Sequence, residues 1–205
     1  MKHCLQSDNL KDYLKSSKTI DFLSVNIQEQ AQILFNAISD ELNIIKIAFN
    51  FTRDDISHSW DIKSKRITKS ASEVLRYKEG ICYAKSMLLA ALLRSQQIPC
   101  GICYQKLTLG DTPDTGYCIH ALNAVYISSI GSWVRIDARG NTNGKDAQFH
   151  INNPSIEQLA FPIRKEYGEI DYPIIYIEPL PITVETLENN IDCIEMIKYN
   201  LPTFI

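Results

Sequence analysis

The feature that most constrains the fold is an uninterrupted apolar run, Met87–Leu93, inside a longer segment of strong helix formers. The segment extends from Tyr83 to about Gln96, and Pro99 prevents the helix from continuing. A helix with so much apolar surface is stable in water only when other elements cover it. We therefore expect a buried helix that the rest of the chain encloses.

Length and composition are sufficient for such a core. The chain has 205 residues, of which 45% are hydrophobic and 22% charged, so we expect a single domain over residues 1–205. The net charge of -3 gives no electrostatic reason to expect nucleic acid or an anionic membrane as a partner. The apolar run is too short to span a bilayer, and residues 1–18 lack the apolar segment of a signal peptide. We expect a cytoplasmic protein with reduced thiols.

Periodicity predicts helices on both sides of the buried one. Apolar residues recur at three- and four-residue steps over residues 26–49, which predicts one long amphipathic helix capped by Asn26. Ser70 and Glu73 form a capping box for a short second helix. A last helix is expected from about Thr183, with apolar residues at helical spacing through Ile191 to Ile194.

Strand signals follow the buried helix. Residues 101–107, 117–127 and 132–138 are rich in β-branched and aromatic residues, and three antiparallel strands are the simplest interpretation. The polar segment 51–70 has no sustained period and is predicted to be a long loop. The fold class is therefore α+β, with helices before and after an antiparallel sheet.

Cys82 lies where a thiol can become a nucleophile. Gly80 is suited to end the preceding helix in a left-handed conformation, and Cys82 follows at the start of the buried helix. The positive end of the helix dipole and a nearby histidine favour the reactive thiolate. An isolated buried cysteine is usually inert, so this interpretation requires a histidine and an orienting residue elsewhere in the chain.

His120 and Asp137 satisfy that requirement. They lie on consecutive predicted strands joined near residues 127–132, and a hairpin that pairs odd with even residue numbers puts both on one face of the sheet. Their side chains are then within reach of a hydrogen bond. In this hypothesis Cys82 is the nucleophile, His120 the general base and Asp137 the group that orients the imidazole.

The sequence around these residues resembles the core of the transglutaminase-like superfamily, relatives of papain, over roughly residues 50–145. The resemblance is carried by EGICYAKSMLLAALLRSQQIPCGICYQ at 79–105, IHALNAVY at 119–126 and WVRIDARGN at 133–141. It implies a papain-like fold in which the nucleophile begins a buried helix packed on an antiparallel sheet. It also implies the same roles for Cys82, His120 and Asp137.

The oxyanion and substrate contacts are less constrained. The superfamily often has an aromatic residue upstream of the nucleophile near the oxyanion site, which implies such a place for Trp60. His58 and Tyr83 are further candidates in this neighbourhood. The backbone N–H of Cys82 is the expected oxyanion donor.

A second constellation consists of Cys100, Cys103, Cys118 and His120, a CxxC followed by a CxH that could hold zinc. Cys100 has an even and Cys103 an odd residue number. Because side chains alternate along a strand, a continuous strand would point them to opposite faces. The same argument weakens a redox interpretation, because a reactive CxxC opens a helix. We therefore expect neither a metal nor a cofactor.

The expected function is thiol-dependent acyl transfer on a peptide or amide bond. A cysteine protease or amidase is the first choice, because the chain has no signal for the additional β domains that surround the core of large cross-linking transglutaminases. An amine-accepting transglutaminase remains an alternative, since residues 51–70 could close over the site as a lid. A non-catalytic protein-binding domain is the other alternative.

Overall fold

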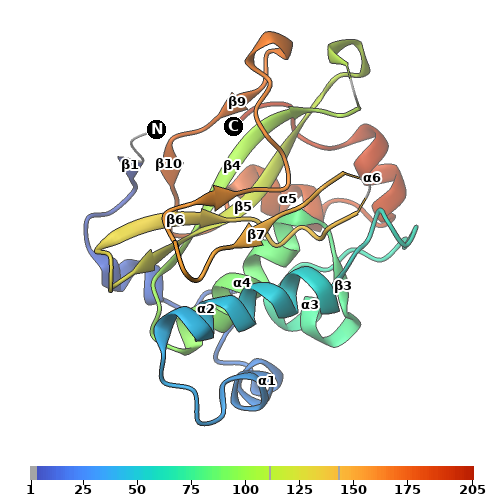
Figure 1. Ribbon diagram of the computed structural model, residues 1–205. Coiled ribbons are helices and arrows are strands. Elements are labelled where there is room, and N and C mark those ends of the chain that lie inside the picture. Colours follow the sequence, from blue (N-terminus) through green and yellow to red (C-terminus); the bar gives the residue numbers. More distant parts are fainter. Residues whose placement is uncertain (1–3, 111, 143) are drawn as a thin grey trace.

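A computed structural model describes residues 4–110, 112–142 and 144–205 (Figure 1). The predicted buried helix is present as α4 (Cys82–Ser95), and Cys82 is its first residue. Every residue from Tyr83 to Arg94 is buried. α4 is therefore the element around which the others pack. Helices come before and after the antiparallel sheet along the chain, which confirms the α+β fold class.

An antiparallel sheet covers one side of α4, with its strands in the order β6-β5-β4-β9 (Figure 1). These strands are β4 (Cys100–Thr108), β5 (Tyr117–Ile127), β6 (Ser132–Ile136) and β9 (Ile170–Asp171). The first three are the strands predicted from the sequence. The short β9 was not predicted, and it pairs with Gln105 and Lys106 of β4.

Helices from both ends of the chain complete the fold. The helices before α4 contact its other side, whereas the C-terminal helices follow the sheet in sequence. The helices are α1 (Val25–Phe35), α2 (Glu41–Asn50), α3 (Ala71–Tyr77), α5 (Pro181–Glu188) and α6 (Cys193–Tyr199). The short strands are β1 (Cys4–Leu5), β2 (Ser57–His58), β3 (Glu79–Gly80), β7 (Gln148–Phe149), β8 (Glu157–Gln158) and β10 (Ile174–Ile175). No helix in the described residues is long and apolar enough to cross a bilayer.

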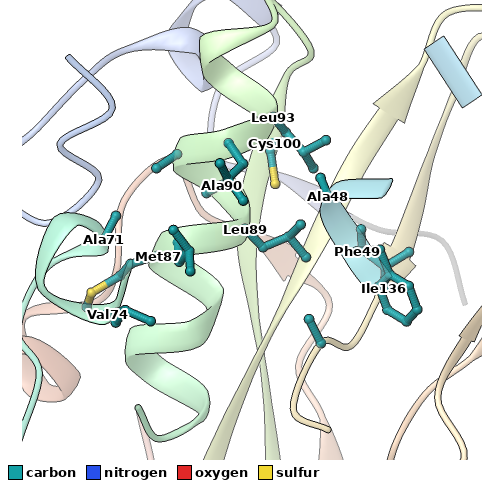
Figure 2. Packing of buried hydrophobic residues seen from close by; sticks show 14 of the residues in the cluster. Ala48, Phe49, Ala71, Val74, Met87, Leu89, Ala90, Leu93, Cys100 and Ile136 are labelled. Carbon is teal, nitrogen blue, oxygen red and sulfur yellow. The ribbon is translucent and has the colours of Figure 1, made fainter. Parts of the chain in front are cut away.

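Buried side chains of α4 point in different directions into this core. Met87 points toward Ala71 and Val74 of α3, and Leu89 points toward Phe49 of α2 (Figure 2). The main hydrophobic cluster joins residues from α1, α2, α3, α4, the sheet, α5 and α6. The packing of α4 therefore depends on elements from the whole length of the described chain.

The predicted helix over residues 26–49 was wrong in its continuity. It is divided into α1 and α2, because Ala37 adopts a positive φ of 60° and Asp40 begins a new helix. The Asp40 carboxylate accepts a hydrogen bond from the Asn43 N–H at 2.8 Å. Asn26 lies inside α1 rather than at its cap. The apolar spacing continues across the break, so periodicity alone does not reveal it.

The prediction for Gly80 was also wrong. Lys78 takes the left-handed conformation that ends α3, with φ 56° and ψ 28°. Gly80 lies in β3, where a Cβ would be 3.0 Å from Thr68 Oγ1 and 3.2 Å from the Cβ of Ala84. Glycine is therefore required for close packing at this position rather than for a left-handed turn.

Two further segments differ from the predictions. The last helix is divided into α5 and α6, and Ile191 between them is 99% exposed instead of buried. The polar segment 51–70 is not a plain loop, because it begins as a π-helix over Phe51–Asp55 and then forms β2. Ser70 does cap α3, since its hydroxyl accepts from the Glu73 N–H at 3.3 Å.

Arg94 joins distant segments at the end of α4. Its side chain is fully buried and donates to the carbonyls of Lys15 at 2.6 Å and Cys100 at 2.9 and 3.1 Å. It also donates to the Ile177 carbonyl and, at 3.2 Å, to the Glu178 carboxylate. One guanidinium thus connects the N-terminal region, β4 and the C-terminal third.

Replacement of Arg94 by Met should destabilise the protein by roughly 3 kcal/mol, because it leaves buried carbonyls without donors. The matched control is Arg76→Met on the exposed part of α3, for which we expect a change within about 0.5 kcal/mol. Urea denaturation of both variants measures the difference. Equal losses in the two variants would contradict this assignment.

Candidate active site

The start of α4 is positioned by a short parallel β pair. β2 pairs with β3 in the register Ser57↔Glu79 and His58↔Gly80, and the Ser59 N–H donates to the Gly80 carbonyl at 3.2 Å. This pairing brings the segment around His58 beside the first turn of α4. Cys82 is half-buried there, and backbone N–H groups in a first helical turn have no partner within the helix.

His120 and Asp137 come together as their strand positions predicted. The last residue pair of β5 and β6 is Asn123↔Ile136, so Asp137 follows β6 and lies diagonal to His120. The His120 Nε2 and Asp137 Oδ2 atoms are 2.8 Å apart. Both side chains are buried, at 4% and 1% exposure.

The Asp137 carboxylate is held by backbone donors as well. The Arg139 N–H donates to Oδ1 and the Ala160 N–H donates to Oδ2, both at 3.1 Å. Burial raises the pKa of Asp137, but the charge and hydrogen bond of His120 together with these two N–H groups outweigh it and hold the pKa below its usual value. Asp137 is therefore an ionised group in a fixed orientation.

The imidazole of His120 interacts with Asp137 and with Cys82. Burial lowers the pKa of His120, but the negative charges of Asp137 and Cys82 and their contacts with the ring raise it to about 10. Because Nε2 contacts Asp137, Nδ1 is the ring nitrogen available to the thiol. The Phe161 ring packs edge-on against the imidazole, with 4.9 Å between ring centroids. The arrangement favours a proton on His120.

A cavity of about 480 Å³ opens beside these residues. Cys82, His120, His58 and Trp60 all contribute to its lining. The other lining residues are Ile81, Leu107, Thr108, Leu109, Cys118, Ile119, Arg139, Lys145, Phe161, Ile197, Lys198, Tyr199 and Leu201. Its volume is sufficient for a small-molecule group or a peptide side chain with part of its backbone.

His58 and Trp60, two of the three residues expected to contact the oxyanion or the substrate, line this cavity. Within the described part of the chain, His58 Nδ1 has no hydrogen-bond partner. Burial, followed by the charges of Arg139 and Lys85, lowers the pKa of His58 well below 6.5, so its ring is neutral. Tyr83 is not brought to the cavity, because its side chain is buried and its hydroxyl donates to the Ile119 carbonyl at 2.9 Å.

The residues of the possible zinc site are divided between two faces of the sheet. Cys100 belongs to the main hydrophobic cluster and Cys103 to a second cluster on the other face of β4. Burial raises the pKa of Cys100 to about 12. Cys118 and His120 share the cavity instead. These side chains therefore do not converge on one point.

Two charged side chains near the site have no clear signal in the sequence. Arg139 forms a bidentate pair with Asp61, at 2.6 and 2.9 Å, and thereby anchors the segment that follows β2. Lys85 is buried one turn after Cys82, and its ammonium donates to the Ile56 carbonyl at 2.5 Å. Burial, with help from Arg139, lowers the pKa of Lys85 to about 7. A lysine in a helix pattern is normally expected in solvent.

The sequence profile of the transglutaminase-like superfamily matches residues 28–138, which is more than half of the chain. The chain belongs to this superfamily. A comparison with curated protein sequences finds no match.

Solved structures show more distant similarity. A provisionally named cysteine protease from Cytophaga hutchinsonii is 21% identical, with a TM-score of 0.48, over 65% of this chain and 43% of its own. A provisionally named protease from Parabacteroides distasonis is 20% identical, with a TM-score of 0.41; the match covers 75% of this chain and 30% of that protein. A structure described as a TGase is 15% identical, with a TM-score of 0.42; the match covers 78% of this chain and 43% of that protein. The matched region is less than half the length of each of these proteins, so the family assignment depends on the superfamily match.

Limiting iodoacetamide should alkylate Cys82 before Cys118, although both line the cavity. His120 contacts Cys82, whereas burial raises the pKa of Cys118 to about 12. Peptide mass mapping after short exposure measures the order, and exposed Cys4 serves as the reference for an ordinary thiol. Labelling of Cys118 with Cys82 unmodified would show that the reactive thiol has been misassigned.

Proposed function

We propose that this chain cleaves peptide or amide bonds through an acyl-enzyme on Cys82, with water as the usual acceptor. The observation that carries the proposal is the 2.8 Å contact between His120 Nε2 and Asp137 Oδ2, with His120 and Cys82 in the lining of one cavity. Cys82 and His120 line the same cavity, and the buried Asp137 contacts His120, so the three residue types needed for thiol-dependent acyl transfer are neighbours.

The first half of the proposed reaction forms the acyl-enzyme. The Cys82 sulfur attacks the carbonyl carbon, and the proton on His120 passes to the leaving nitrogen as the C–N bond breaks. Asp137 keeps the imidazole in one orientation and stabilises its positive charge. The products of this half are a thioester on Cys82 and a free amine.

The second half releases the acyl group. A water molecule attacks the thioester carbonyl, His120 accepts a proton from the water, and the C–S bond breaks to give a carboxylic acid and restore the Cys82–His120 pair. The N–H of Cys82 is the proposed main oxyanion donor, because it lies in the first turn of α4. The ring N–H groups of His58 and Trp60 are the proposed side-chain contacts to substrate, since both rings line the cavity.

The anchoring of residues 51–70 supports water rather than an amine as acceptor. A lid that excludes water must move, but this segment is tied to the core at several points. Asp61 pairs with Arg139, Ser59 bonds to Gly80, and Lys85 holds the Ile56 carbonyl. We propose that water competes well in this site.

We also propose that residues 1–205 act as one domain, of which residues 1–3, 111 and 143 lie outside the described residues. The main hydrophobic cluster supports this, because it includes residues from Ile20 to Met196. Its members therefore come from nearly the whole chain, and an independent second core is not needed to explain the packing.

A pool of peptides with defined ends should be cleaved to free carboxylic acids in the presence and in the absence of excess primary amine. Mass spectrometry of the products distinguishes an acid from an amine-linked acyl group. Cys82→Ala is the control and should abolish product formation. Predominantly amine-linked product at modest amine concentration would identify the enzyme as a transferase instead.

Asp137→Asn should lower kcat/KM by a factor on the order of 10²–10⁴ while the protein remains folded, because the amide no longer stabilises the charged imidazole. Asp114→Asn in an exposed turn is the matched control and should retain full activity. Circular dichroism and steady-state kinetics of both variants test this. Full activity of Asp137→Asn would mean that another residue orients His120.

A further inference from the structure

We propose that the acyl group that Cys82 accepts is apolar, with an aliphatic chain or ring next to the scissile carbonyl. The inference rests on the proposed function and adds the class of substrate. It comes from one part of the cavity lining, which we call the aliphatic wall and define as Leu107, Ile119, Ile197 and Leu201.

The aliphatic wall is built by segments from different parts of the chain. Leu107 is near the end of β4, and Ile119 is on β5 directly before His120. Ile197 belongs to α6 and Leu201 follows it; both are only partly buried against the core. Their remaining apolar surface is part of the same cavity lining as Cys82.

Polar groups at the wall already have partners. The Ile119 N–H donates to the Pro202 carbonyl, and the Ile119 carbonyl accepts from Tyr83, both at 2.9 Å. The hydroxyl of Thr108 donates to the Gly110 carbonyl at 2.7 Å. Lys198 extends toward the Glu195 carboxylate, at 3.6 Å. The wall therefore presents mainly hydrocarbon to a bound group.

This surface distinguishes apolar from polar acyl groups. A side-chain amide or carboxylate would lose its hydrogen bonds to water against the wall without gaining equivalent partners. An alkyl or aromatic group would instead remove its own apolar surface and that of Ile197 and Leu201 from water. Each added methylene should therefore improve the reaction until the wall is covered.

p-Nitrophenyl esters of increasing chain length test this directly. The Cys82 thiolate attacks the ester carbonyl, the bond to p-nitrophenolate breaks, and water then hydrolyses the acyl thioester to the free acid and the thiol. The absorbance of p-nitrophenolate measures each turnover. With Cys82→Ala as the blank, kcat/KM for the hexanoate should exceed that for the acetate by about tenfold or more.

Two wall variants and one control locate the effect. Ile197→Ser and Leu201→Ser should each reduce the hexanoate-to-acetate ratio of kcat/KM by about threefold or more. Ile191→Ser is the matched control, because Ile191 is 99% exposed and lies outside the cavity lining. Its ratio should equal that of the unmodified protein.

The possible failures are distinguishable. Cys82-dependent turnover of all esters at similar kcat/KM would overturn the apolar acyl site and leave the proposed function intact. A chain-length preference that persists unchanged in both wall variants would also overturn it, because the preference would then arise elsewhere. Absence of any Cys82-dependent turnover, together with an inert Cys82 toward iodoacetamide, would overturn both the inference and the proposed function.

Discussion

The candidate site depends on the hydrogen bond between His120 and Asp137. Both side chains are almost completely buried, so burial of either one without the other as a partner would destabilise the folded protein. Their 2.8 Å contact, together with the N–H groups of Arg139 and Ala160, keeps the carboxylate ionised and the imidazole protonated. The proposed chemistry at Cys82 follows from this pair, because His120 lines the same cavity as the thiol.

The pair in turn requires the sheet and α4 to be held rigidly against each other. α4 carries Cys82 at one end and Arg94 at the other, and the buried guanidinium of Arg94 bonds to three separate segments. At the first end, the β2–β3 pairing keeps His58 beside Cys82. A small shift of α4 would change the distance between the Cys82 sulfur and His120. The hydrogen bonds of Arg94 and the β2–β3 pairing therefore contribute to the geometry of the site, although Arg94 lies at the far end of the helix.

Much of this arrangement could be predicted from the sequence, for physical reasons that apply to particular residues. The apolar run in α4 leaves few alternatives to burial, and the two-residue period of a strand puts His120 and Asp137 on one face once their hairpin is known. The breaks after α1 and α5 could not be predicted, because apolar spacing continues through Ala37 and Ile191. The Ala160 N–H, Ile197 of α6 and Leu201 after it come from segments with no local signal that they return to the site.

The most direct test of the central claim is the protonation state of His120, measured by nitrogen-15 NMR of the imidazole rings at about pH 7.5. Signals can be assigned with His58→Gln and His120→Gln. The account predicts a doubly protonated His120 and a neutral His58 in the same molecule, because their pKa values are displaced in opposite directions. Asp137→Asn should lower the pKa of His120. A neutral His120 at this pH, or a pKa that does not change in Asp137→Asn, would contradict the account.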